Sequence, residues 1–329
     1  MISHRGWHWF AAVAVFAVVC VAAVATGAVR IAAADVIRAI AGYGDEAAVA
    51  IVRNLRLPRV ALAALIGAGL GMSGGALQGT LRNGLAEPYL LGVSGGAAVG
   101  AVGAFAVGVA NPGWIALAAF AGAIVAVLLA LLVARAAGRG GRGDPRTLLM
   151  AGVVIGAFAN AVIMVALANA PPNTIRGALW WMMGSAGDAT WSTVGILALS
   201  VLAGGAALVY LARDIDILAL GEEPAAALGV NVDRAARTIY LLSALLAAAT
   251  VAAAGLVGFV GLIVPHIVRT AGVRRHRPLL LGAALIGATL VVGADLTARV
   301  IRPPAELPLG AITAILGVPF FLSQLRRTA

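Results

Sequence analysis

The feature that most constrains this chain is a run without a single charged side chain, from Pro88 to Ala134. A helix that crosses the hydrocarbon core of a membrane needs about 20 apolar residues, so this run is too long for one span. The sequence Asn111-Pro112-Gly113 divides it, because these residue types favour a turn. Over the whole chain, hydrophobic residues make up 62% and charged residues 11%, against roughly half and a quarter in soluble domains. The sequence therefore predicts a polytopic membrane protein.

The composition also indicates how the spans pack. The 329 residues include 42 glycines, and small residues let membrane helices approach each other closely. A transmembrane barrel would instead need strands of about ten residues in which polar and apolar side chains alternate, and the sequence shows no such alternation. We therefore predict an all-α fold, a compact bundle of membrane helices.

Apolar segments of spanning length occur at nine places, and a tenth segment is short. The run from Thr238 to Val268 exceeds one span but falls short of two, because several glycines and Pro265 divide it into a full helix and a short one. The predicted spans are 11–29, 60–81, 92–110, 114–134, 147–169, 191–212, 238–257, the short segment that follows, 279–298 and 307–325. This gives about ten crossings in a single domain that covers residues 1–329.

An even number of crossings places both termini on one side of the membrane, and the arginines indicate which side. All 23 basic residues are Arg. With both termini in the cytoplasm, 15 of them fall on the cytoplasmic side and 8 outside, as the positive-inside rule requires. The same rule explains the formal charge of +10 without a nucleic-acid partner. We predict a multi-pass protein of the inner (cytoplasmic) membrane, in contact with lipid.

A polar stretch from Gly221 to Gly229 lies between two charge-free spans, and it begins with Glu222 and Glu223 before it becomes rich in alanine. This pattern predicts a short surface helix on the cytoplasmic side that contacts a soluble partner, an ATPase. The chain has no Lys, and a Walker A loop needs one to reach the nucleotide phosphates. ATP and Mg²⁺ must therefore bind a separate ATPase subunit, and the chain itself is predicted not to be an enzyme.

Arg53, Arg56 and Arg59 break the arginine rule, because they lie outside, just before a span. If the segment is helical, their spacing of three places them on one face. Two interpretations are open at this point. The arginines could anchor the helix among lipid headgroups, or they could form a docking patch for an acidic soluble partner, since Arg binds carboxylates in bidentate fashion.

Few ionisable residues lie within the spans. Asp295 stands near the end of one, and Arg299 follows four residues later, which predicts an ion pair that also orients Arg299; a direct role in transport is the alternative. The four histidines are too scattered to predict a metal site. An ion-coupled transporter or a membrane-embedded enzyme would need ionisable residues that face one another, and the spans lack them.

Several motifs then converge in order along the chain. They are Arg56–Arg59, the Gly-rich stretch Gly67–Gly79, Leu81–Gly96, Trp181–Gly184, Ala219–Glu222, Gly255–His266 and Ala305–Gly310. Together they closely resemble the FecCD/BtuC-type permeases, over about residues 10 to 327.

The resemblance implies a type II ABC importer. In this family two permease copies of ten helices each form a dimer around a central pathway, two ATPase subunits dock from the cytoplasm, and a soluble binding protein docks from outside. The substrates are iron–siderophores, haem and cobalamin. We expect an iron chelate, either a siderophore complex or haem, because that branch is the largest. Cobalamin is the alternative within the family, and an ion-coupled secondary transporter is the alternative outside it.

The resemblance also assigns roles to individual positions. Arg56, Arg59 and Arg299 match arginines that receive carboxylates of the binding protein. The segment 214–236 matches the coupling helices that sit in a cleft of the ATPase. Its predicted coupling residues are Gly221, Glu222, Glu223, Ala226 and Gly229.

Asn83 and Leu85 match a loop that forms a cytoplasmic gate. Gly84 stands between them where the family usually has Pro. Because Gly allows more backbone freedom than Pro, we expect a less rigid gate. No cofactor and no metal are expected on this chain.

Overall fold

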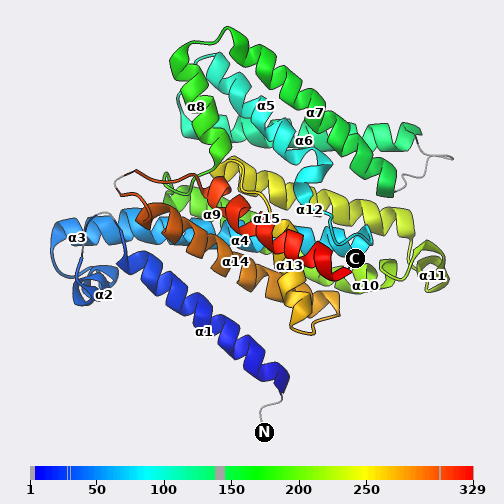
Figure 1. The fold of residues 1–329 in the computed structure, drawn as a ribbon, viewed down its shortest axis with the longest axis horizontal. Helices are drawn as coiled ribbons and strands as arrows, with labels where there is room; N and C mark the ends of the chain where they lie inside the picture. The colour runs from blue at the N-terminus through cyan, green and yellow to red at the C-terminus, as the bar shows by residue number, and fades with distance from the viewer. Residues whose placement is uncertain (1–3, 28, 30, 138–144, 304, 329) are drawn as a thin grey trace.

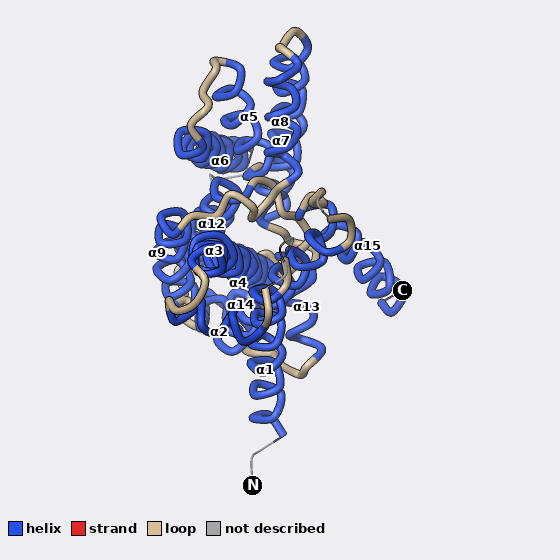
Figure 2. Tube along the Cα trace, turned by 90° about the vertical axis from the view of Figure 1, so that its left-hand side faces the viewer, coloured by secondary structure: helices blue, strands red, loops and turns tan. Residues whose placement is uncertain are grey.

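The computed structural model describes residues 4–27, 29, 31–137, 145–303 and 305–328, and every regular element within these ranges is a helix. Figures 1 and 2 show the helices gathered into one bundle. A helix satisfies its own backbone hydrogen bonds, which a segment inside a membrane requires. The predicted all-α fold is confirmed. Arg139 and Arg142, two of the 15 arginines predicted on the cytoplasmic side, lie outside the described residues.

Ten helices fall on the ten predicted spans. Seven of them are long and apolar enough to cross a membrane. These are α1 (His4–Ala25), α4 (Leu57–Thr80), α6 (Pro112–Ala137), α7 (Pro145–Ala168), α9 (Trp191–Tyr210), α12 (Val232–Ala254) and α14 (His276–Val300). Three further apolar helices complete the set: α5 (Val93–Ala106), α13 (Val260–Thr270) and α15 (Leu309–Thr328).

Short helices occupy the two ends of the bundle. One end carries α2 (Ala33–Ala41), α3 (Glu46–Ala50), the π-helical turn η1 (Ile51–Arg56) and α8 (Pro172–Met183). The other end carries α10 (Ala212–Leu218) and α11 (Glu222–Ala227). Figure 1 shows these groups on opposite sides, and we call them the α3 end and the α11 end. A single turn, η2 (Pro88–Leu91), precedes α5.

α4 lies at the centre of the bundle, in contact with α9, α12, α13 and α14. Its glycines bring the helix backbones into direct contact. A Cβ on Gly67 would lie 2.0 Å from the carbonyl oxygen of Gly287 in α14, and one on Gly74 would lie 2.0 Å from that of Gly261 in α13. No larger residue fits at these crossings, so the high glycine content is explained by close helix packing.

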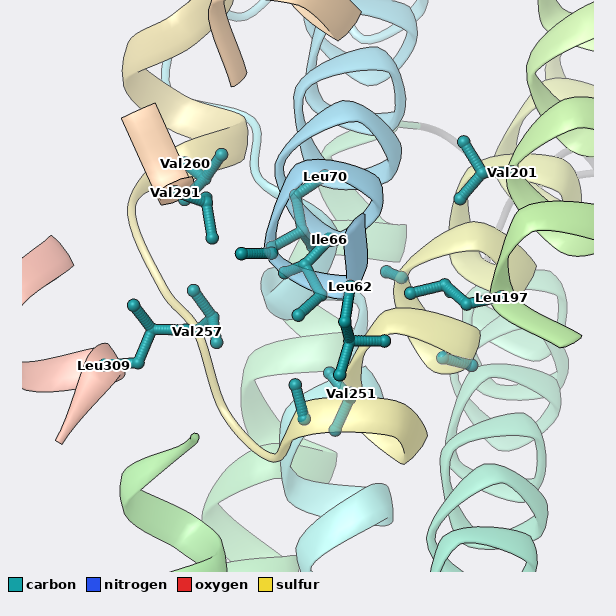
Figure 3. Close-up of a cluster of buried hydrophobic side chains, with 14 of the residues drawn as sticks. Leu62, Ile66, Leu70, Leu197, Val201, Val251, Val257, Val260, Val291 and Leu309 are labelled. Atoms are coloured by element: carbon teal, nitrogen blue, oxygen red, sulfur yellow. The ribbon is translucent and has the colours of Figure 1, made fainter. Parts of the chain in front are cut away.

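Large apolar side chains fill the remaining space around α4. Leu62, Ile66 and Leu70 are almost fully buried. Figure 3 shows them among apolar side chains of α9, α12, α13, α14, α15 and the segment between α12 and α13, namely Leu197, Val201, Val251, Val257, Val260, Val291 and Leu309. α4 is therefore the central helix of the hydrophobic core, and it extends between the two ends of the bundle.

α5, α6, α7 and α8 form a second group beside α12 (Figure 1). Much of its surface is apolar and exposed, for example Phe158 and Met164 of α7. Soluble proteins rarely expose apolar patches of this extent. Lipid or another membrane subunit must therefore cover this surface.

Candidate functional site

The α3 end gathers five charged side chains from three parts of the chain. Arg56 and Arg59 stand where η1 joins α4, Asp295 and Arg299 lie in the last turns of α14, and Glu306 lies in the loop before α15. We call these five residues the ion cluster. A buried charge is costly unless it is paired, so the bonds within the cluster decide what each residue can do.

Asp295 is the centre of the ion cluster, and its side chain is only 2% exposed. Arg59 donates from Nε to Oδ1 at 3.0 Å and to Oδ2 at 3.1 Å. The Nε of Arg299 lies 3.1 Å from Oδ2. The predicted ion pair of Asp295 and Arg299 is therefore confirmed, and the same carboxylate also holds a second arginine.

Glu306 is the second carboxylate that binds Arg59. Nη1 donates to Oε1 and Nη2 to Oε2, both at 2.8 Å, which is the bidentate geometry in which Arg pairs most strongly with a carboxylate. These hydrogen bonds from Arg59 hold the pKa of the Glu306 carboxyl below its usual range. Because the Glu306 side chain is 40% exposed, this pair is the part of the cluster that solvent reaches.

Arg56 and Arg299 point inward, to the end of α1. Arg56 is 5% exposed and donates to the carbonyl oxygens of Val24 and Ala25 at 2.9 and 3.0 Å. Arg299 donates to two carbonyl oxygens of the same helix end at 3.0 and 3.1 Å. The last carbonyls of a helix lack helical partners, so these arginines cap α1. The docking role of Arg56, Arg59 and Arg299 stays a prediction, and all three are engaged in internal bonds.

The prediction that Arg53, Arg56 and Arg59 share one face is wrong. Arg53 is exposed, whereas Arg56 is buried. The reason is the π-helical turn of η1, whose wider i→i+5 spacing changes the direction in which successive residues point. The backbone carbonyl of Arg53 accepts a hydrogen bond from the Nε1 of Trp191 at 3.0 Å, which fixes η1 against α9.

Three loops that sequence reasoning did not connect meet at the α3 end. The backbone N–H of Ser185 donates to Ala254 at 2.8 Å, and that of Leu309 donates to Gly184 at 3.0 Å. Gly255 has φ +71°, and a Cβ there would lie 2.1 Å from a backbone oxygen of α8. The ends of α8 and α12 and the start of α15 are thus joined. The glycines in these segments were the only feature of the sequence that could have indicated this contact.

At the α11 end, two glycines set the limits of α11. Gly221 has φ +118° and Gly229 has φ +82°, conformations that favour Gly, which explains why the predicted stretch begins and ends there. Ala225 is fully buried and anchors the helix. The remaining predicted coupling residues, Glu222, Glu223 and Ala226, are exposed.

Two leucines extend this exposed surface. Leu220, just before α11, is 63% exposed, and Leu228, just after it, is 59% exposed. Exposed acidic and apolar side chains thus lie close together on α11 and at its two ends, while Ala225 is buried against the bundle. Such a surface can enter a groove of another protein, because a helix offers its apolar residues as anchors.

α10 connects this surface to α14. The Asp216 Oδ1 accepts a hydrogen bond from the backbone N–H of His276 at 2.9 Å and lies 2.7 Å from the His276 Nδ1. His276 is buried and begins α14. Because α14 ends at the ion cluster, one helix joins the α11 end to the α3 end.

The predicted gate loop follows α4. The Asn83 Oδ1 accepts a hydrogen bond from the backbone N–H of Leu85 at 2.9 Å, which closes an Asx turn. Leu85 is half-exposed. Nothing lies within 4 Å of a Cβ placed on Gly84, so its neighbours do not require Gly there. The gate role of Asn83 and Leu85 stays a prediction.

Two further residues, missed in the sequence, hold this loop. The Glu87 Oε1 accepts a hydrogen bond from the backbone N–H of Phe259, and the Tyr89 hydroxyl accepts one from that of Val257, both at 2.9 Å. They fix the loop against the non-helical segment between α12 and α13. In the described part of the chain, no group of three or more His, Cys, Asp or Glu side chains could hold a metal ion.

Comparison with known proteins agrees with this arrangement. Residues 15–327 match the FecCD transport family. The chain is 42% identical to the cobalamin import system permease protein BtuC of Halobacterium salinarum, over 85% of this chain and 74% of that protein. It is 41% identical to the hemin transport system permease protein HmuU of Yersinia pestis, over 82% of this chain and 81% of that protein.

Two more similarities extend the comparison. The Fe(3+)-citrate import system permease protein YfmE of Bacillus subtilis is 35% identical, over 84% of this chain and 82% of that protein. A solved structure described as an inward-facing conformation of a metal-chelate type ABC transporter superposes with a TM-score of 0.86 at 26% identity, covering 97% of this chain and 98% of that one. This chain therefore belongs to the FecCD transport family, the permeases of type II ABC importers.

Proposed function

We propose that this chain is the permease of an ATP-driven importer that carries an iron chelate, a siderophore complex or haem, across the cytoplasmic membrane. Two copies surround a central pathway. A soluble binding protein delivers the substrate at the α3 end, outside the cell, and two separate ATPase subunits, which bind ATP and Mg²⁺, dock at the α11 end. Both termini are then cytoplasmic. The chain itself catalyses no reaction.

The observation that carries this proposal is the surface of α11. Exposed Leu220 and Leu228 flank two exposed glutamates, on a helix anchored by Ala225. Exposed leucines on a polar surface are unfavourable in the free protein and become favourable when a partner buries them. The lack of Lys excludes a Walker A loop from this chain, so the partner is where ATP binds.

The link from α11 to the α3 end supports transport driven from the cytoplasm. The bond between Asp216 and His276 attaches α10 to the start of α14, and the ion cluster attaches the end of α14 to α1 and α4. A displacement of α11 would therefore be transmitted along a single rigid helix. Asn83 and Leu85, in the loop after α4, would close the cytoplasmic end of the pathway between rounds of ATP hydrolysis.

Docking of the binding protein would involve exchange at Arg59. Glu306 already occupies the guanidinium of Arg59 in bidentate fashion, so a carboxylate of the binding protein must take the place of Glu306. Arg56 and Arg299 hold the cluster in position and contribute positive charge, while their own hydrogen bonds remain with α1.

The names of the relatives support a metal–organic substrate. Hemin and Fe(3+)-citrate occur in the names of two relatives, and the structural neighbour is of metal-chelate type. Cobalamin is the second candidate, because the Halobacterium relative at 42% identity carries that name. All three are bulky complexes in which organic ligands enclose a metal, so the permease need not hold the metal itself.

The test is reconstitution in liposomes with the cognate ATPase and binding protein. Uptake of radiolabelled ferric siderophore, haem and cobalamin is measured with and without ATP. We expect ATP-dependent uptake of one iron chelate that requires both partners. Uptake without the ATPase would overturn the proposed mechanism, and uptake of cobalamin alone would replace the proposed substrate by the second candidate.

A further inference from the structure

A cavity of about 780 Å³ lies between α1 and the α13–α14 hairpin, at the end of the bundle that also holds α11. Its walls are apolar and come from three elements, with Trp9 and Ala12 on α1, Ile267 on α13, and Leu285 and Ile286 on α14. Figures 1 and 2 show the N-terminal half of α1 extending away from the body of the bundle. The cavity is the space that this divergence leaves.

The depth of the cavity corresponds to one leaflet of a membrane. Its lining on α14 begins beside the first residues of the helix, at Pro278, and continues through Gly282 to Ile286. From the start of α14 at His276 to Ile286, a rise of 1.5 Å per residue gives about 15 Å. Half of a hydrocarbon core of about 30 Å is the same length. The cavity therefore reaches from the membrane surface to the middle of the bilayer.

Trp9 forms a fixed wall of the cavity. A Cβ on Gly282 would lie 3.4 Å from the Cη2 of Trp9 and 2.9 Å from Val268, so the indole packs closely over α14 at this point. Trp is the residue that prefers the membrane interface, because its ring is apolar and its N–H is polar. This placement agrees with the depth derived from α14.

The charge of the cavity is confined to its mouth and is positive. Arg274 and Arg275 of the α13–α14 loop line it, together with His8 at the start of the apolar part of α1. Both arginines are exposed. Among the described residues that line the cavity, none is an Asp or Glu. An anion at the mouth would thus meet two guanidinium groups and no carboxylate of the described lining. Asp216, which lines a neighbouring cavity with Arg275, is bonded to His276.

We propose that this cavity binds one anionic phospholipid. The phosphate is held by Arg274 and Arg275, and an acyl chain lies along the apolar wall of α1 and α14. Two features select this ligand. A soluble anion would not use a 15 Å apolar wall, and a zwitterionic lipid would gain less from two arginines without a balancing acid. Only the assignment to the cytoplasmic leaflet rests on the proposed function; the binding itself does not.

Binding would also stabilise the position of α1. Bound lipid would fill the space between α1 and α13–α14, so it would favour the state in which the two are held at this separation. Because α1 also contributes the carbonyls that Arg56 and Arg299 cap, the lipid and the ion cluster act on opposite ends of the same helix.

The test is native mass spectrometry of the purified full chain, titrated with phosphatidylglycerol or with phosphatidylcholine of identical acyl chains. We expect one tightly bound phosphatidylglycerol and no comparable phosphatidylcholine. Arg274→Gln should weaken the binding about fivefold, the factor for one arginine near a membrane surface. Arg277→Gln is the matched control, because Arg277 is exposed in the next turn but does not line this cavity.

A second variant separates shape from charge. Ala12→Trp fills the cavity from α1 and should abolish the tight site while Arg274 and Arg275 are unchanged; thermal melting in lipid-free detergent confirms that it is folded. The proposal is overturned if the two lipids bind alike, if Arg277→Gln loses as much affinity as Arg274→Gln, or if inorganic phosphate displaces the lipid at equal concentration.

Discussion

The charged side chains of the ion cluster at the α3 end are bonded to one another, whereas those of α11 are exposed. Asp295 receives two arginines in a site that is almost completely buried. Glu222 and Glu223 of α11 lie in solvent, and within the described ranges neither makes an ion pair. The charges of the ion cluster therefore stabilise the fold, whereas those of α11 are available to a partner. Variants at each end can test this division.

The largest effect is expected from Asp295→Ala. Without this carboxylate, Arg59 and Arg299 face each other in a buried site without their shared partner, and breaking a buried ion pair in this way costs about 3–5 kcal/mol. We expect a large drop in the melting temperature of the purified protein. Glu222→Ala, which removes an exposed acid at the other end, should leave the melting temperature unchanged. Equal melting temperatures of the two variants would show that the ion cluster does not stabilise the fold.

The second largest effect is expected from breaking the contact between Asp216 of α10 and His276 of α14. Asp216→Ala removes the acceptor of two contacts to His276, which leaves buried polar groups unsatisfied at a cost of about 1–3 kcal/mol. We expect a moderate loss of stability and, in the reconstituted importer, ATP hydrolysis that is less dependent on the binding protein. Asp214→Ala, two residues earlier on α10, is the control. Full coupling in Asp216→Ala would show that α14 does not transmit the motion.

These two sites also show what the sequence could and could not predict. Asp295 and Arg299 are four residues apart on one helix, so their pairing follows from helix geometry alone. Arg59 and Glu306 are separated by 247 residues, and no local rule brings them together. The same holds for Asp216 and His276, which required the packing of α10 against α14. Local spacing predicts a pair within an element, whereas pairs between elements depend on the tertiary fold.

The helices also differ in whether the sequence predicts them. Nine of the ten spans could be predicted because twenty apolar residues in a row have few other uses, and the short tenth because glycines and Pro265 divide the run that holds it. α11 could be located because Gly221 and Gly229 mark its limits. The helices α2, α3 and α8 could not, because they are short, amphipathic and dependent on the bundle for their stability. The sequence likewise did not predict the π-helical turn of η1, within which Arg53 is exposed and Arg56 is buried.

A smaller effect is expected at the α11 surface. Leu228→Ser should not change the melting temperature, because the side chain is largely exposed in the free chain. It should weaken assembly with the ATPase about tenfold, since a buried apolar anchor contributes roughly 1–2 kcal/mol to an interface. Size-exclusion chromatography of the complex over a dilution series measures this. Leu199→Ser in the middle of α9, where the leucine is also exposed, is the control, and equal weakening by both would remove α11 from the interface.

The smallest effect separates the exchangeable part of the ion cluster from its fixed part. Glu306→Gln removes the charge that competes for Arg59 but leaves Asp295 in place, so we expect the binding protein to dock about two- to fivefold more tightly, the range of a half-exposed ion pair. Glu46→Gln removes an equal charge at the same end, away from Arg59, and should have no effect.

The pH dependence of docking to Glu306→Gln tests whether the charge of Glu306 is what competes for Arg59. Arg59 lowers the pKa of Glu306 in the folded protein, so the stabilising contact is fully present above the ordinary carboxyl pKa of about 4.3 and is lost only as the pH falls through the lower folded value. The ratio of affinities between Glu306→Gln and the unmodified chain should therefore stay constant from about pH 5.5 to 8, because Glu306 is ionised throughout. Affinities measured by surface plasmon resonance at several pH values give this ratio. A ratio that falls to one by pH 5.5 would mean that Glu306 is neutral there and that Arg59 does not hold it, and the α3 end would then offer its charges as freely as α11 does.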